Sequence, residues 1–174
     1  MTKKHLVFTF FSLFVYQFIF AQRITLDTNV NRSIHLYEDG YTKSFGVKMY
    51  PGALTYKTFY TPNKAIEYSG YITLDGFWIS AINEIHTPIK DDNQLSWYIG
   101  YGGHFNLWSE KYKLNNPAKS AGVAVGVDGM LGLDYKLKNA PINISVDIQP
   151  AFNFVGASYF DLGWGGIGIR YTIK

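Results

Sequence analysis

The sequence has 174 residues, a formal net charge of +3, 47% hydrophobic residues and no cysteine. This length is enough for one domain, and without cysteine the chain has no disulfide, no cysteine metal ligand and no lipid-modified N-terminal cysteine. Two of the 16 basic residues lie at positions 1–21, which hold no acidic residue, so the remainder of the chain is nearly neutral. Near neutrality argues against a nucleic-acid partner, which normally requires a basic face.

The N-terminus has the pattern of a secretory signal peptide. Lys3 and Lys4 form a basic start, residues 6–20 are almost wholly apolar, and Ala21 precedes Gln22. The apolar run is shorter than the roughly 20 residues that a membrane-spanning helix needs. We therefore expect export with cleavage, and an uncleaved membrane anchor is the alternative.

From residue 44 onward, apolar and polar residues alternate in segments that turn-forming residues separate. Alternation with a period of two indicates β-strands, because successive side chains of a strand point to opposite faces. Thr61–Lys64 and Asp75-Gly76 predict tight turns, and residues 109–120 form the longest polar connection. The predicted strands cover 44–50, 54–60, 65–73, 77–87, 96–108, 122–138, 142–153 and 162–174.

The segment 122–138 carries the strongest signal. Val127 and Leu131 belong to a face of aliphatic residues with glycine and tyrosine, whereas Asp128 and Asp134 belong to a face of ionisable and small residues. A strand of this length exceeds the about 5–6 residues that are typical of a globular sheet. A long strand with one apolar and one polar face is typical of a transmembrane β-barrel, whose apolar face meets lipid.

The number of predicted strands is even, and bacterial single-chain barrels close antiparallel with both termini on one side. We therefore predict an all-β fold, a closed antiparallel transmembrane β-barrel of about eight strands with a periplasmic N-terminus. The predicted domains are a signal peptide at 1–21, an exposed N-terminal lead-in at 22–43 and an outer-membrane β-barrel at 44–174.

Four segments carry a further signal, namely Trp97–His104, Gly126–Tyr135, Val146–Phe152 and Gly168–Thr172. In their order and spacing they resemble the small outer-membrane β-barrel proteins of Gram-negative bacteria, a porin-like group with an OmpA/OmpX-like fold. The resemblance covers most of the mature chain. It implies an outer-membrane location and contacts with membrane lipid, lipopolysaccharide and the barrel insertion machinery, and it implies no reaction. Such chains commonly end on an aromatic residue, whereas this one ends on Lys174.

The polar faces of the predicted strands collect charges of both signs. Eight strands enclose an interior just wide enough for side chains to fill it. Because an unpaired buried charge is costly, we expect these residues to pair across the lumen, and an ion path or a ligand site is the alternative. The candidate network comprises Lys57, Glu67, Glu84, His104, Asp128, Asp134, Lys136, Asp147 and Arg170, and Lys48 lies on the same face. Glycines on that face leave room for long side chains, namely Gly100, Gly102, Gly126, Gly132, Gly166 and Gly168.

His104 is the candidate for catalysis, because it would face the same interior as Asp128. A histidine beside acids is more often a hydrogen-bonded interior residue than a general base. Glu84 and His86 share a face but lack the further ligands of a metal site. No glycine-rich loop precedes a helix. The sequence therefore predicts no catalytic residue, no metal and no cofactor.

Aromatic residues near the strand ends are expected to form belts at the membrane interface, namely Tyr56, Tyr60, Trp97, Tyr135, Phe152 and Trp164. The sequence thus favours a non-enzymatic integral outer-membrane β-barrel with a structural or surface-interaction role and a filled lumen. A barrel enzyme that modifies lipid A and a soluble lipocalin-like barrel that binds a hydrophobic ligand remain as alternatives. A soluble barrel would invert the pattern, with polar residues outside and apolar residues inside.

Overall fold

The computed structural model describes residues 41–174 except 51, 75, 91, 116, 118–121, 157 and 158. The predicted signal peptide and all of the predicted lead-in before residue 41 lie outside the described residues. The described residues form eight strands and one short helix. Their bounds are β1 Lys43–Lys48, β2 Ala53–Thr61, β3 Lys64–Thr73, β4 Gly76–Ile89, β5 Asp92–Trp108, α2 Glu110–Asn115, β6 Gly122–Lys136, β7 Ile142–Val155 and β8 Tyr159–Ile173.

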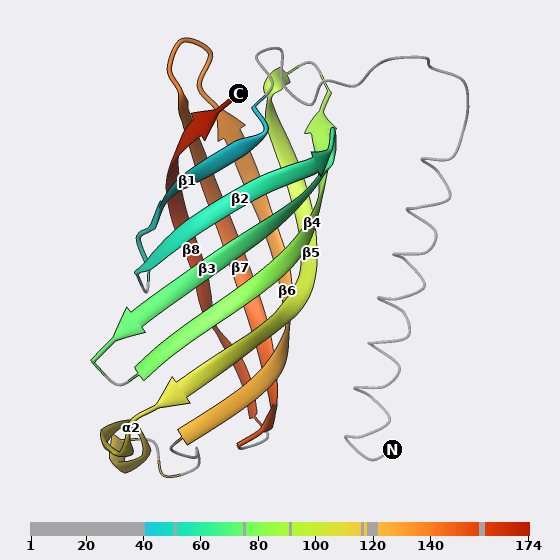
Figure 1. The fold of residues 1–174 in the computed structure, drawn as a ribbon. Coiled ribbons are helices and arrows are strands. Elements are labelled where there is room, and N and C mark those ends of the chain that lie inside the picture. Colours follow the sequence, from blue (N-terminus) through green and yellow to red (C-terminus); the bar gives the residue numbers. More distant parts are fainter. Residues whose placement is uncertain are drawn as a thin grey trace, which may run out of the picture. The chain divides into compact units, whose positions relative to one another are not determined.

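The strands form one closed antiparallel barrel in chain order (Figure 1). Each strand pairs with the next along the chain, and β1 closes the barrel by pairing with β8, with Lys43 opposite Ile173 and Lys48 opposite Gly168. The predicted all-β fold and the closed eight-stranded barrel are therefore confirmed among the described residues. One end of the barrel carries the start of β1 and the end of β8, and we call it the termini end. The other end carries α2, and we call it the helix end (Figure 1).

The helix α2 lies where the sequence predicts a polar loop, so that prediction is wrong over six residues. Ser109 precedes the helix, and its Oγ accepts a hydrogen bond from the backbone N–H of Tyr112 at 3.2 Å. This contact caps the first turn, where backbone donors have no partner within the helix. The Tyr112 ring stacks on Trp108 at the end of β5, with 4.2 Å between ring centroids. Among the described residues no helix has the length and apolar character needed to cross a membrane.

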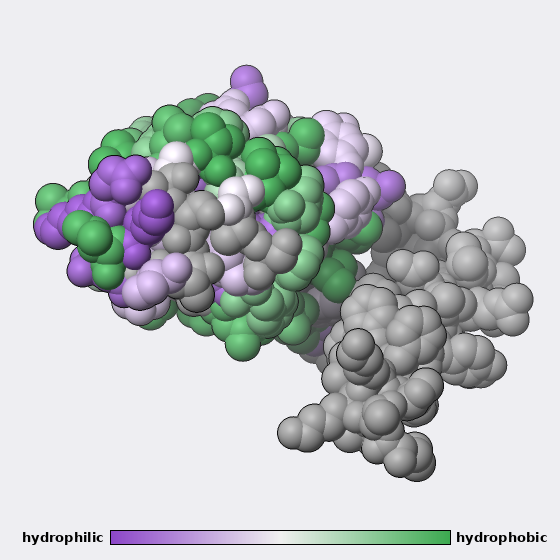
Figure 2. Space-filling model, turned by 90° about the horizontal axis from the view of Figure 1, so that it is seen from below, coloured by the Kyte–Doolittle hydropathy of each residue, from purple (hydrophilic) through white to green (hydrophobic). Residues whose placement is uncertain are grey.

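The two faces of the barrel wall differ as the alternation predicts. On β6, Leu131 points outward and keeps 50% of its surface exposed, whereas Asp134 points inward and is fully buried. The same alternation holds on β7, where Val146 and Ile148 are exposed and Asp147 is buried. Seen from the helix end, hydrophobic side chains surround the wall, and hydrophilic side chains gather at α2 (Figure 2). The exterior is therefore apolar and the interior polar.

Trp164 is the exception among the aromatic residues predicted to form interfacial belts. It shares its face of β8 with Arg170 and packs inside the barrel on Trp78, with 3.3 Å between ring centroids, and on Tyr71. The placement of Trp164 in an outer belt is therefore wrong, because its side chain follows the inward alternation of β8. The other five aromatic residues of the predicted belts lie on the outer face, namely Tyr56, Tyr60, Trp97, Tyr135 and Phe152.

Candidate functional site in the barrel lumen

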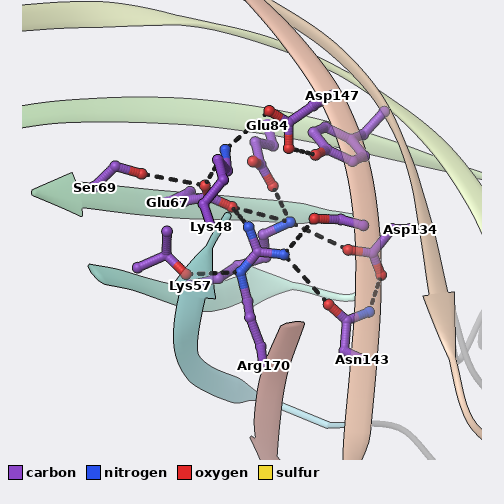
Figure 3. A network of polar contacts seen from close by, with 12 residues as sticks. Lys48, Lys57, Glu67, Ser69, Glu84, Asp134, Asn143, Asp147 and Arg170 are labelled. Atoms are coloured by element: carbon purple, nitrogen blue, oxygen red, sulfur yellow. Dashed lines mark hydrogen bonds and ion pairs between the residues drawn. The ribbon is translucent and has the colours of Figure 1, made fainter. Parts of the chain in front are cut away.

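A network of buried charges connects side chains from several strands inside the barrel (Figure 3). Each member occupies an inward-facing position of its strand, so the alternation of seven strands brings the charged groups together across the lumen. The members are Lys48 on β1, Lys57 on β2, Glu67 on β3, Glu84 on β4, Asp134 on β6, Asp147 on β7 and Arg170 on β8. All of their side chains are buried.

Glu67 is the centre of the network. Its Oε2 lies 2.6 Å from Nη2 of Arg170, and its Oε1 lies 3.0 Å from Nζ of Lys48. Lys57 Nζ lies 3.4 Å from the same Oε2. Ser69 Oγ donates a further hydrogen bond to Oε1 at 3.3 Å. Three cations therefore surround one carboxylate, which offsets the cost of removing that carboxylate from water.

Lys57 connects this centre to two further acids. Its Nζ lies 2.8 Å from Oε2 of Glu84 and 3.3 Å from Oδ2 of Asp134. The same ammonium lies over the ring of Tyr98, 4.5 Å from the ring centroid, which is within the range of a cation–π contact. The Lys57 ammonium therefore contacts three carboxylates and one aromatic ring.

Arg170 uses the remaining donors of its guanidinium on neutral side chains. Nε donates to Oγ1 of Thr55 at 3.1 Å, and Nη1 donates to Oγ of Ser145 at 2.7 Å and to Oδ1 of Asn143 at 3.4 Å. Asn143 in turn donates to Oδ1 of Asp134 at 2.6 Å. The guanidinium is thus held by side chains of three other strands, β2, β3 and β7, which fixes its position across the lumen.

Asp147 completes the network on the side of β7. Its Oδ1 lies 2.9 Å from Nζ of Lys48, and its Oδ2 accepts a hydrogen bond from the hydroxyl of Tyr98 at 2.8 Å. Among the described residues the network contains three cations and four carboxylates. His86 Nε2 lies 2.9 Å from Oε2 of Glu84, so this carboxylate has a second partner besides Lys57.

The structure brings together six of the nine residues predicted for the network and adds Lys48 to them. His104 and Asp128 form a separate pair nearer the helix end, with 2.9 Å between Nδ1 and Oδ2. His104 Nε2 lies 3.0 Å from Oδ1 of Asn153, so both ring nitrogens have partners. Lys136 has a different role, because its Nζ donates to the backbone carbonyls of Leu137 and Ala140, both at 2.7 Å. That contact closes the turn between β6 and β7.

A second histidine, His86, has partners that the sequence did not predict. The sequence places His86 and Glu84 on one face of a strand but indicates no further partner for them. His86 lies between Ser96 and Glu84, with 3.3 Å from Nδ1 to the Ser96 Oγ. The three residue types are those of a hydrolase triad. Here, however, all three side chains are buried, and the imidazole stacks against Tyr98 and packs on Phe59. In this arrangement a substrate has no access to the hydroxyl, so the array acts as part of the packed interior.

Glycine provides space for these side chains at three of the six predicted positions, whereas a Cβ at Gly102 or Gly166 would meet the backbone of Ala81 or Tyr50. A Cβ at Gly132 would lie 2.6 Å from Cζ of Tyr98, and a Cβ at Gly168 would lie 3.0 Å from Nη1 of Arg170. A Cβ at Gly126 would overlap the ring of His104. Alternating glycines therefore allow long side chains to lie flat across the lumen.

The fold and the site together define a class, a closed eight-stranded antiparallel β-barrel with an apolar exterior and an ion-paired interior. Among the described residues no group of three or more histidine, cysteine or acidic side chains could hold a metal ion. Comparisons with family models, with curated proteins and with solved structures found no match. The class therefore stands on the geometry of this chain alone.

Proposed function

We propose that this protein is an integral outer-membrane β-barrel without enzymatic activity, exported through its signal peptide, with a structural or surface-interaction role. The observation that carries this proposal is the inverted polarity of the barrel: charged side chains lie inside and aliphatic side chains lie outside. This polarity is typical of a barrel in lipid and is opposite to that of a soluble lipocalin-like barrel.

The energetic argument concerns the outer face. Exposed aliphatic side chains of β6, β7 and β8 are contiguous, and they include Leu131, Leu133, Val146, Ile148 and Ile169. Apolar surface in contact with water costs roughly 25 cal/mol per Å² relative to its burial, and soluble monomers rarely expose large contiguous patches. A lipid environment removes that cost. The partners of the protein would then be membrane lipid, lipopolysaccharide and the barrel insertion machinery.

The ion network supports a role other than transport. Arg170 lies on β8 and Glu67 on β3, and their side chains meet in the interior of the barrel. Lys48 and Lys57 contact Glu67 at the same place. The paired side chains occupy the path that an ion would follow. A surface role would then fall to the loops and to α2 at the helix end.

Cell fractionation tests the proposal directly. We expect the protein in the outer-membrane fraction, and we expect the folded protein to run as a faster band on unheated gels than on heated gels. A soluble periplasmic monomer would contradict the proposal and would favour the lipocalin-like alternative.

The array of Ser96, His86 and Glu84 has the residue types of a hydrolase triad, but its buried hydroxyl argues against the alternative of a barrel enzyme that modifies lipid A. Mass spectrometry of lipid A from cells with and without the protein would test this second candidate. A mass difference that disappears in a Ser96→Ala variant would establish the enzyme. Identical lipid A in both strains would support the non-enzymatic role.

A further inference from the structure

An apolar groove of about 740 Å³ crosses the outer face of the barrel from β2 to β6. Its floor consists of three small residues, Gly70 on β3, Ala81 on β4 and Gly103 on β5. Ala81 and Gly103 lie directly opposite each other in the sheet. A Cβ added at Gly70 would have no neighbour within 4 Å, so the depression there is open. Larger side chains flank the floor, among them Tyr68 and Phe105.

The groove leads toward a polar group on the same outer face. Asn83 and Tyr101 are the next outward positions beyond Ala81 and Gly103, about 7 Å further toward the termini end at the rise of a β-strand. Asn83 Oδ1 accepts a hydrogen bond from the Tyr60 hydroxyl at 2.8 Å, and Asn83 Nδ2 donates to the Tyr101 hydroxyl at 3.0 Å. An amide thus lies on a wall that is otherwise apolar.

Two donors of this polar group have no acceptor among the described residues. The Tyr101 oxygen accepts the bond from Asn83, so its own O–H is available, and Asn83 Nδ2 has a second N–H. A donor that faces hydrocarbon without a partner is costly. The complementary ligand therefore carries acceptor oxygens at one end and an apolar chain at the other.

We propose that this groove binds a single phospholipid molecule. One acyl chain lies over Gly70, Ala81 and Gly103, and an ester or phosphate oxygen accepts hydrogen bonds from Asn83 and Tyr101. The headgroup then points toward the termini end, near the hairpin turn Thr61–Lys64. This site rests on the proposed membrane location of the barrel.

The shape of the groove favours a lipid over a second copy of the barrel. Each of three strands contributes a single small residue to the floor, so the floor is narrow. The larger side chains of Tyr68 and Phe105 lie beside it. A second barrel wall would meet those rings before it reached the floor. It would also leave the two donors opposite an apolar surface, since the outer faces of the other strands are mostly aliphatic or aromatic.

Native mass spectrometry of the folded full-length mature protein tests the site. The protein is purified in a detergent without phosphate or ester groups, and phosphatidylethanolamine is added as the probe. We expect one retained phospholipid per barrel. Gly70→Leu fills the floor and should weaken retention about tenfold, which corresponds to about 1.4 kcal/mol. The control is Val146→Phe, which adds bulk at an outward-facing residue of β7 outside the groove.

The polar end is tested by removing one hydroxyl at a time. Tyr101→Phe removes a donor that is available to the lipid and should weaken retention severalfold. Tyr60→Phe removes a hydroxyl whose proton is already used on Asn83 and should change retention by less than about twofold. Equal weakening by Gly70→Leu and Val146→Phe, or retention that Tyr101→Phe leaves unchanged, would overturn the site.

Three further outcomes separate this proposal from the proposed function. A dimer without bound lipid, broken by Gly70→Leu, would show that the groove is an interface between two copies and would overturn the lipid site. Failure of the folded protein to enter phospholipid vesicles would overturn the membrane function itself. Insertion without a retained lipid would overturn only the site.

Discussion

Tyr98 on β5 lies directly opposite Gly132 on β6, and the tyrosine ring occupies the space that a side chain at position 132 would need. The ring lies flat because glycine is there, and its hydroxyl then reaches Asp147 on β7 at 2.8 Å. One small residue on the inner face therefore determines where a large one extends, and the large one stabilises a carboxylate of the ion network.

Gly132→Ala is expected to destabilise the barrel by about 1–3 kcal/mol, because the new methyl group overlaps the Tyr98 ring and crowds the interior. Urea unfolding of the protein in lipid vesicles, followed by tryptophan fluorescence, measures this change. Gly129→Ala on the outer face of the same strand is the control and should be nearly neutral. A combined Gly132→Ala and Tyr98→Leu variant should lose less than the sum of the single changes. Strict additivity would contradict the contact.

Arg170→Met should cost about 3–5 kcal/mol in the free energy of unfolding, because it removes the cation closest to Glu67 and increases the excess of carboxylates over cations in the network. The same urea experiment checks this value. Lys138→Met, at an exposed lysine in the turn after β6, is the control, with an expected effect within about 0.5 kcal/mol.

The contribution of the Arg170–Glu67 ion pair is measured by combining Glu67→Gln with Arg170→Met in one variant. The double variant should be more stable than the sum of the single changes predicts, by about 0.5–3 kcal/mol. A coupling energy of zero would mean that the 2.6 Å contact between Arg170 and Glu67 contributes nothing that Lys48 and Lys57 do not already supply.

Leu131→Arg should impair folding into a bilayer by about 2–4 kcal/mol if Leu131 lies near the membrane midplane. Leu74→Arg is the matched control, because Leu74 lies in the turn after β3 with 93% of its surface exposed. Folding yield into phospholipid vesicles distinguishes the two variants. If both arginines are tolerated equally, the outer face does not meet lipid.

Planar-bilayer recordings of the purified folded protein should show no stable pore of the kind that porins form, because paired side chains fill the lumen. Replacing both Arg170 and Glu67 by alanine removes the central pair and should produce small, brief openings. Large and stable openings of the unchanged protein would place transport ahead of a structural role.

The alternation of residue types determined the faces of the barrel. From the sequence alone, Leu131 could be assigned to the exterior and Asp134 to the interior, because the period of a strand is two and the pattern is unbroken from 122 to 136. The number of strands followed in the same way from the turn-forming residues between them. Trp164 was wrongly assigned to the outer belt because its position near a strand end was given more weight than the alternation. The alternation places Trp164 on the same inward face of β8 as Arg170.

The partners across the lumen were decided by the tertiary structure. Arg170 and Glu67 are 103 positions apart in the chain, and Ser96 and His86 meet only because β4 and β5 pair in one particular register. The alternation states that a residue points inward but leaves open how far along the barrel axis it lies. That height depends on the register of every strand pair around the closed wall, so the sequence could name the candidate charges but not separate His104, Asp128 and Lys136 from the network.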